Sequence, residues 1–215
     1  MLIKESYADV QTSANGKESP MITGPVARFA RQIAGQGYIV AAPSSYHDFT
    51  GPEPLAYDVP GTDQGNEWKT LESYDEDSYK TVDYLLSLPT CTGRIGATGM
   101  CLGGHLALRA SPNLGPYTAA NTSPSAPLNS THTLDLLSRL RGEVALIFGI
   151  KDTHVPDAGR DLIRLKMREA GVTFSMHEFA WAQHAFIRDE LSKGRYDPAI
   201  TKACFEVLLE VLGGC

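Results

Sequence analysis

A cysteine within a run of glycines is the first residue of this sequence whose type and position could do chemistry. The stretch Gly99-Met100-Cys101-Leu102-Gly103 has the form of a nucleophile elbow, a sharp strand-turn-helix junction, with cysteine in place of serine. Glycines two positions away on either side would avoid collisions with the neighbouring strand and helix, and a helix N-terminus favours a thiolate. The pentapeptide alone supports a nucleophilic thiol and a buried structural cysteine about equally.

Two later residues, Asp152 and His184, favour the interpretation of Cys101 as a nucleophile over that of a structural cysteine. Cys101 precedes Asp152 by 51 residues and Asp152 precedes His184 by 32, so the chain order is nucleophile, acid, histidine. Taken alone, Asp152 could cap a turn or helix, and His184 could be a polar loop residue. Together they predict a triad in which His184 takes the thiol proton or pairs with the thiolate, and Asp152 fixes the histidine tautomer. The backbone N–H of Leu102 would then be one oxyanion donor.

Hydrophobic periodicity predicts the elements that must position these residues. The first expected helix starts at Thr23 and ends at Gly35, and further helices are expected over 73–88, 102–110, 134–140, 157–170 and 199–212. Strands are expected over 38–42, 94–99, 117–121, 144–149 and 172–179. This alternation predicts a mostly parallel sheet with helices on both faces, and ligands bind beyond the carboxyl ends of such strands. The three candidate residues should therefore converge on one edge of the sheet.

Composition restricts the class of protein. The 215 residues predict a single domain over 1–215, with 1–22 atypical or weakly ordered, and the net charge of −6 argues against nonspecific nucleic-acid binding. The sequence has no apolar run of about 18 residues, so no membrane span is expected, and its N-terminus lacks the apolar core of a secretion signal. The four cysteines are scattered, which predicts reduced thiols and a cytoplasmic location.

Three segments resemble the dienelactone hydrolase family: 99–105 around the cysteine, 148–156 around the aspartate and 184–188 around the histidine. The resemblance runs from about Thr23 to the C-terminus. It implies a three-layer α/β-hydrolase sandwich, a Cys-His-Asp triad and hydrolysis of a small ester or lactone, without a metal or organic cofactor. The family's namesake reaction opens a cyclic enol ester, dienelactone, to a dicarboxylic product.

Other residues carry weaker signals. The resemblance implies that Arg188 faces the carboxylate of the substrate, but a surface arginine capping a loop is an equally good interpretation. His154, close to Asp152, could suggest a metal, although a loop residue at a strand end is the favoured interpretation. The remaining histidines show no paired metal-ligand spacing, so no metal is expected. The long segment 44–71 could line a pocket or be a solvated loop.

The N-terminal part departs from the family's pattern. The family has an apolar strand before the first helix, and a following loop with a second oxyanion donor, whereas 13–22 contains no run of Val, Ile or Phe. We therefore expect an internally shortened member that lacks about one central strand and the neighbouring edge hairpin. Loss of one oxyanion donor typically slows catalysis by about 10²–10³. The alternatives are a catalytically impaired or non-enzymatic binding protein with this fold, and a redox-responsive thiol protein.

Overall fold

The computed structural model describes residues 24–46, 69–111, 120–124, 131–188 and 195–213. The internal packing of the chain divides it into two compact units, 1–93 and 94–215. All three residues of the expected triad belong to the second unit. No helix among the described residues is long and apolar enough to span a bilayer.

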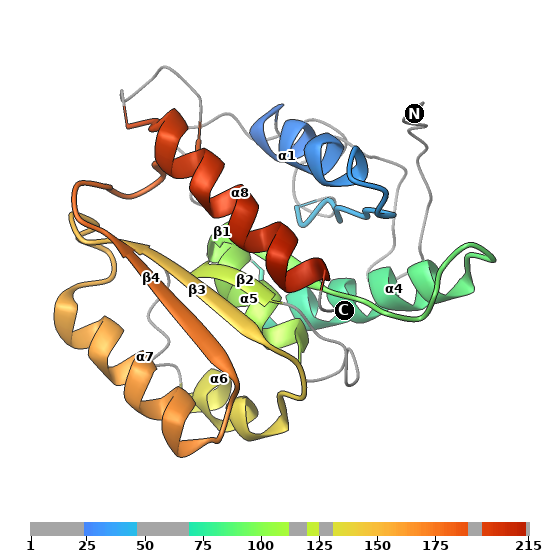
Figure 1. Ribbon diagram of the computed structural model, residues 1–215. Helices are drawn as coiled ribbons and strands as arrows, with labels where there is room; N and C mark the ends of the chain where they lie inside the picture. Colours follow the sequence, from blue (N-terminus) through green and yellow to red (C-terminus); the bar gives the residue numbers. More distant parts are fainter. Residues whose placement is uncertain (1–23, 47–68, 112–119, 125–130, 189–194, 214–215) are drawn as a thin grey trace. The chain divides into compact units, whose positions relative to one another are not determined.

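The second unit contains a parallel sheet with the strand order β1-β2-β3-β4 (Figure 1). Its strands are β1 (Ala97–Cys101), β2 (Ala120–Pro124), β3 (Val144–Gly149) and β4 (Phe174–Phe179). The carboxyl ends of parallel strands meet at one edge, so the segments that follow β1, β3 and β4 come together there. These are the segments that hold the candidate residues.

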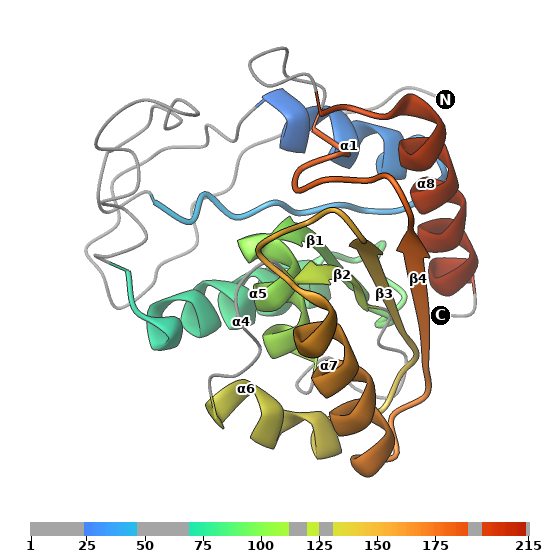
Figure 2. The same ribbon diagram turned by 90° about the vertical axis from the view of Figure 1, so that its left-hand side faces the viewer.

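Helices cover both faces of this sheet. They are α5 (Leu102–Ala110), α6 (Thr131–Leu136) with a 3-10 turn over Leu137–Arg139, α7 (Asp157–Glu169) and α8 (Pro198–Gly213). Figures 1 and 2 show α5, α6 and α7 on one face and α8 on the other. The predicted α/β architecture is therefore confirmed, and within the described residues the sheet has no strand before β1.

The central strand β3 is buried on both faces. Val144, Leu146 and Phe148 pack with Leu108 of α5 and with two apolar residues of α7, Ile163 and Met167. The alternate residues face the other way, where Ala145 packs with Val211, and Ile147 with Cys204, both on α8. A strand buried on two faces needs a continuous apolar run, which is why the sequence pattern predicted its bounds correctly.

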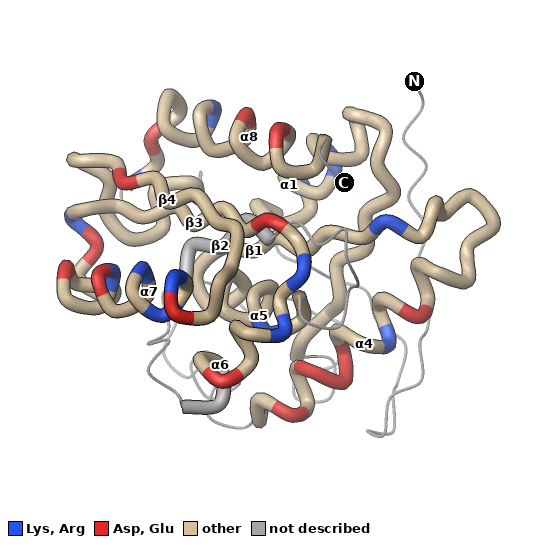
Figure 3. The backbone as a smooth tube through the Cα atoms, turned by 60° about the horizontal axis from the view of Figure 1, so that its bottom comes forward, with Lys and Arg blue, Asp and Glu red and all other residues tan. Residues whose placement is uncertain are grey.

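Helix α7 is amphipathic, and Figure 3 shows residues of both charges along it. The side chain of Arg160 is only 4% exposed and ion-pairs with Glu178 on β4 and with Asp157, at 2.7 Å for the first. The same guanidinium donates to the carbonyl of Val155 at 2.6 Å. These bonds hold the segment between β3 and α7, which carries Asp152, against β4.

The first unit contributes two described helices, α1 (Gly24–Ala34) and α4 (Leu71–Ser87). Before α4, the buried Lys69 ammonium donates to Asp77 at 2.5 Å and to the carbonyl of Ser45 at 2.6 Å. These bonds join the two ends of the long segment 44–71. Residues 47–68, with most of that segment, lie outside the described part of the chain.

The prediction of a buried strand over 38–42 is wrong. Residues 38–44 have no regular structure, and the side chain of Ile39 is 45% exposed. A strand needs a neighbour for its backbone N–H and C=O groups, and none of the ladders in the described residues includes this segment. Apolar content alone does not provide that neighbour.

Two other strands are shifted toward the C-terminus of the predicted ranges. The expected strand 94–99 lies at Ala97–Cys101, and the expected strand 117–121 lies at Ala120–Pro124, with 117–119 outside the described residues. The first shift matters for function, because β1 runs directly into α5 at Cys101 without a connecting loop.

Close packing at this junction makes Gly99 irreplaceable. A Cβ atom at Gly99 would lie 2.1 Å from the carbonyl oxygen of Gly103 and 2.9 Å from the backbone nitrogen of Gly104. Backbone atoms cannot move aside cheaply, so we expect Gly99→Ala to lower the free energy of unfolding by about 3 kcal/mol, measured by urea denaturation.

Gly103→Ala is the matched control. Contrary to the steric role expected for Gly103, a Cβ atom there would have no neighbour within 4 Å, because it is the carbonyl of Gly103, and not its Cα, that approaches Gly99. This variant should be as stable as the parent or more stable, since alanine favours the helical conformation by about 1 kcal/mol. Equal destabilisation by both substitutions would contradict this account of the junction.

Candidate active site

Cys101 occupies a strained turn between β1 and α5. It is the last residue of β1 and the N-cap of α5, with φ of 61° and ψ of −128°, a conformation that side-chain-bearing residues seldom adopt. Such strain persists only where the surroundings enforce it, and it is frequent at functional sites. The turn leaves Cys101 exposed at the carboxyl edge of the sheet, directly before the N–H groups of the first turn of α5.

Asp152 lies in a tight turn directly after β3. Its backbone N–H donates to the carbonyl of Gly149 at 3.1 Å, and the residue is only 8% exposed. The turn is held from the next loop as well, because the N–H of Lys151 donates to the carbonyl of Ala182 at 3.0 Å. Asp152 is therefore fixed close to the segment that carries His184.

The loop after β4 carries His184 and is held at several points. The backbone of this loop packs closely against β3, because a Cβ atom added at Gly149 would lie 2.4 Å from the carbonyl oxygen of Ala182. Ala185 adopts a φ of 63°, which turns the chain sharply after the histidine. The N–H of Asp197, which caps α8, donates to the carbonyl of Phe186 at 2.9 Å. The histidine thus comes from an ordered loop.

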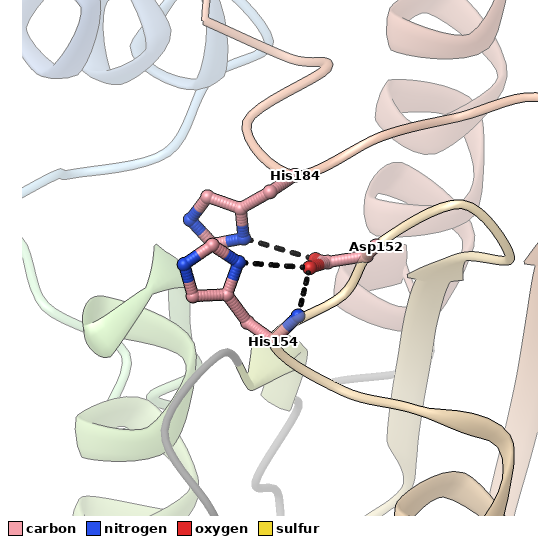
Figure 4. Close-up of side chains that lie close together, drawn as sticks. All are labelled: Asp152, His154 and His184. Atoms are coloured by element: carbon pink, nitrogen blue, oxygen red, sulfur yellow. Dashed lines mark hydrogen bonds and ion pairs between the residues drawn. The ribbon is translucent and has the colours of Figure 1, made fainter.

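The structure brings the three predicted residues together. Cys101 Sγ lies 3.3 Å from His184 Nε2, and His184 Nδ1 lies 2.9 Å from Asp152 Oδ2. Figure 4 shows His184 with Nδ1 directed at the carboxylate. An ionised carboxylate only accepts hydrogen bonds, so Nδ1 must carry the proton, which leaves Nε2 to interact with the thiol.

Asp152 and His184 stabilise each other's charged forms. Burial raises the pKa of Asp152, but the hydrogen bonds from His184 and from the backbone of His154 outweigh burial and hold it below its usual range. The hydrogen bond to Asp152, followed by that to Cys101, raises the pKa of His184 from 6.5 to about 9, although burial of the ring acts against the shift. At neutral pH the geometry therefore favours an imidazolium between a carboxylate and the sulfur.

A fourth residue, His154, belongs to the same site. Its Nδ1 lies 3.2 Å from Asp152 Oδ1, and its backbone N–H donates to the same oxygen at 2.9 Å. Its ring centroid is 4.1 Å from that of His184. The sequence favours a loop residue at position 154, and the one signal for a role at the site is the position of His154 two residues after the acid. Asp152, His154 and His184 each offer a metal-ligand atom within 4.8 Å of the others, and here both histidines hydrogen-bond to the carboxylate of Asp152.

The other predicted site residues, Leu102 and Arg188, lie on the segments that carry Cys101 and His184, whereas two further histidines lie elsewhere. Leu102 opens α5, so its N–H lies in the first turn after the thiol. Arg188 is half-buried at the end of the His184 loop, and its backbone N–H donates to the carbonyl of Ala185 at 3.0 Å. His105 is buried on α5 against Thr133, and His177 on β4 contacts Ser175, so neither joins the site. His47 lies outside the described residues.

The family follows from comparison with known proteins. A model of the dienelactone hydrolase family matches residues 22–214. The chain belongs to the dienelactone hydrolase family. A Saccharomyces cerevisiae protein, provisionally named a carboxymethylenebutenolidase, is 45% identical over 98% of this chain and 91% of its own length. A Synechocystis protein of the same name is 23% identical, over 74% of this chain and 68% of its own length.

Solved structures show the same fold. A provisionally named dienelactone hydrolase of Klebsiella pneumoniae superposes with a TM-score of 0.77 at 22% identity, over 89% of this chain and 81% of its own. A dienelactone hydrolase-like promiscuous phosphotriesterase from metagenomic libraries gives 0.73 at 20% identity, over 89% and 80%. As a member of the dienelactone hydrolase family, the chain is a carboxylic ester or lactone hydrolase.

The comparison also bears on the expected internal shortening. The alignment with the yeast relative extends over 249 positions, whereas this chain has 215 residues. At least 34 positions (249 − 215) therefore hold a residue of the relative and none of this chain. This difference supports the prediction that a dienelactone hydrolase-family segment is missing here, in line with a described sheet that ends at β1.

Proposed function

We propose that this dienelactone hydrolase-family protein is a thiol-dependent hydrolase of a small ester or lactone, with Cys101, His184 and Asp152 as its triad. The observation that carries the proposal is the continuous line of contacts from the Cys101 sulfur through both ring nitrogens of His184 to Asp152. The alternative of an impaired binding protein is not favoured, because the side chains that hydrolysis requires are held within hydrogen-bonding distance.

The chemistry follows from these positions. The Cys101 thiolate attacks the carbonyl carbon, and the negative charge that develops on the carbonyl oxygen is stabilised by the N–H of Leu102 at the start of α5. When the C–O bond breaks, His184 Nε2–H gives its proton to the leaving oxygen. The now neutral His184 takes a proton from water, whose hydroxide attacks the thioester, releasing the acid and restoring the thiolate. Asp152 keeps the proton on Nδ1 throughout.

The substrate class is proposed to be a small lactone that bears a carboxylate, as the name of the yeast relative, a carboxymethylenebutenolidase, suggests. Arg188, on the same loop as His184, would bind that carboxylate through two parallel hydrogen bonds. We expect Arg188→Met to raise KM for a carboxylate-bearing lactone by about tenfold, while KM for an uncharged lactone of the same ring size stays unchanged. Equal effects on both lactones would contradict a carboxylate-binding role.

Turnover with an activated ester and with dienelactone tests the proposal. Steady hydrolysis of p-nitrophenyl acetate, and opening of the lactone to the diacid identified by mass spectrometry, are the expected results. Stoichiometric acylation of Cys101 without turnover would contradict the proposed hydrolase and would indicate that the missing segment has disabled the oxyanion site. Absence of any reaction with either compound would also contradict it.

The pH dependence should reflect the raised pKa of His184. Below about 9, the imidazolium can pair with the thiolate and donate a proton to the leaving group; above it, that donor is lost. We therefore expect kcat/KM to fall as the pH rises through about 9. The measurement uses an uncharged ester at constant ionic strength, and an upper limb centred near pH 7 would contradict the imidazolium–thiolate pair.

The proton of the His184 imidazolium also affects the stability of the folded chain. Because the folded-state pKa of His184 is raised from 6.5 to about 9, the folded chain binds this proton more tightly than the unfolded chain. The resulting stabilisation is fully present below about pH 6.5 and is lost as the pH rises through about 9. Replacing His184 with glutamine should remove this part of the pH dependence of the melting temperature.

A further inference from the structure

The carboxylate of Asp152 is shared by two histidines. Oδ2 accepts a hydrogen bond from His184 Nδ1 at 2.9 Å, while Oδ1 accepts the backbone N–H of His154 at 2.9 Å and lies 3.2 Å from its Nδ1. Figure 4 shows both imidazoles with their Nδ1 atoms on the side of the carboxylate. Because a carboxylate only accepts, Nδ1 of His154 must be a donor.

The two hydrogen bonds donated by His154 restrict rotation of the Asp152 carboxylate. The final torsion of an aspartate is broad, so a single hydrogen bond from His184 leaves the carboxylate free to rotate. With Oδ1 held by the N–H and Nδ1–H of His154, rotation breaks bonds at both oxygens. The orientation that presents Oδ2 to His184 is then the favoured one.

The ring of His154 also covers His184. The two ring planes are inclined by 34° with centroids 4.1 Å apart, so one face of the His184 imidazole is in contact with the His154 ring. The side chain of His154 is 55% exposed, whereas that of His184 is 16% and that of Asp152 is 9% exposed. His154 is therefore the solvent-facing member of this cluster, and its inner face limits displacement of the His184 ring.

We propose that His154 is a positioning residue of the hydrolase: it fixes the carboxylate of Asp152 and covers His184, so that His184 Nε2 stays directed at the Cys101 sulfur. The inference rests on the proposed function of Cys101. Of the two contacts, the hydrogen bond to Asp152 carries the larger effect, because it determines where Oδ2 lies.

Three substitutions separate the contacts. His154→Ala removes both the ring and the donor, His154→Phe keeps only the ring, and His154→Asn places an amide N–H where Nδ1–H was. We expect kcat to fall about 10–100-fold in His154→Ala and about tenfold in His154→Phe, with KM within twofold of the parent, since misplaced catalytic groups cost rate rather than binding. His154→Asn should recover kcat to within about threefold of the parent.

Thr153→Ala is the matched control, because Thr153 is the exposed neighbour on the same turn. It should leave kcat, KM and the melting temperature unchanged, and all three His154 variants should keep the melting temperature of the parent. A His154→Ala enzyme with kcat within twofold of the parent overturns the proposal. So does a raised KM at constant kcat, or a higher kcat for His154→Phe than for His154→Asn.

A substrate-free readout separates this proposal from the proposed function. In a background with Cys91 and Cys215 replaced by alanine, alkylation of Cys101 by iodoacetamide below neutral pH reports how well His184 supports the thiolate. His154→Ala should slow it about tenfold, and His154→Asn should restore it. If the parent alkylates but hydrolyses no ester or lactone, the proposed function fails while the role of His154 is still measured. An unchanged alkylation rate in His154→Ala overturns that role.

Discussion

Replacing Cys101 by alanine should reduce ester and lactone turnover by at least about 10⁴-fold, because no other nucleophile in the described part of the chain contacts His184 Nε2. Cys101 is exposed and lies 3.3 Å from His184 Nε2, so its removal takes away both the attacking atom and the partner of the imidazolium. The measurement is kcat/KM for p-nitrophenyl acetate, corrected for hydrolysis by buffer. The fold should be retained, with a melting temperature close to that of the parent.

Cys91→Ala is the control for this result. Cys91 is a half-buried loop thiol, and Cys204 is buried on α8, where burial raises its pKa to about 12 and keeps it protonated. Iodoacetamide should therefore inactivate the parent and Cys91→Ala alike, and with Cys215, which lies outside the described residues, also replaced by alanine, intact mass should show one fast adduct that is absent in Cys101→Ala. Turnover in Cys101→Ala above about 1% of the parent would show that another group does the chemistry.

Replacing Asp152 by asparagine should lower kcat about 10³–10⁴-fold with little change in structure. An asparagine amide can donate to His184 Nδ1, which stabilises the tautomer with the proton on Nε2 and leaves no base facing the thiol. The hydrogen bond to Asp152 is also the main cause of the raised pKa of His184. The upper limb of the pH profile, near pH 9 in the parent, should therefore move to lower pH in the variant.

Asp161→Asn provides the comparison for the loss of one negative charge. Its carboxylate is 74% exposed and pairs with Arg164 on the surface of α7, where an ion pair contributes little. Activity and pH profile should both match the parent. An Asp152→Asn enzyme that keeps more than about a tenth of the parent kcat, with an unmoved upper limb, would contradict the role of Asp152 in orienting His184.

The helices and strands that position the site could be predicted where the burial of the segment itself determines its hydrophobic pattern. The helix Leu102–Ala110 and the strand Val144–Gly149 have the predicted bounds: no residue of this helix is exposed, and the strand is buried on both faces. The segment 38–42 has the same kind of apolar run and is not a strand. Whether such a run forms a strand depends on a neighbour elsewhere in the chain, which no local pattern reports.

The candidate site, like the fold, could be predicted only in part from the sequence. Residue type, the glycine-flanked elbow and the order of Cys101, Asp152 and His184 along the chain could be read from the sequence alone. Their distances, the proton on His184 Nδ1 and the inclusion of His154, whose two bonds to Asp152 no spacing revealed, required the folded structure. Hydrogen bonds of about 3 Å need side chains from three separate segments, and the packing of the whole sheet sets where those segments meet.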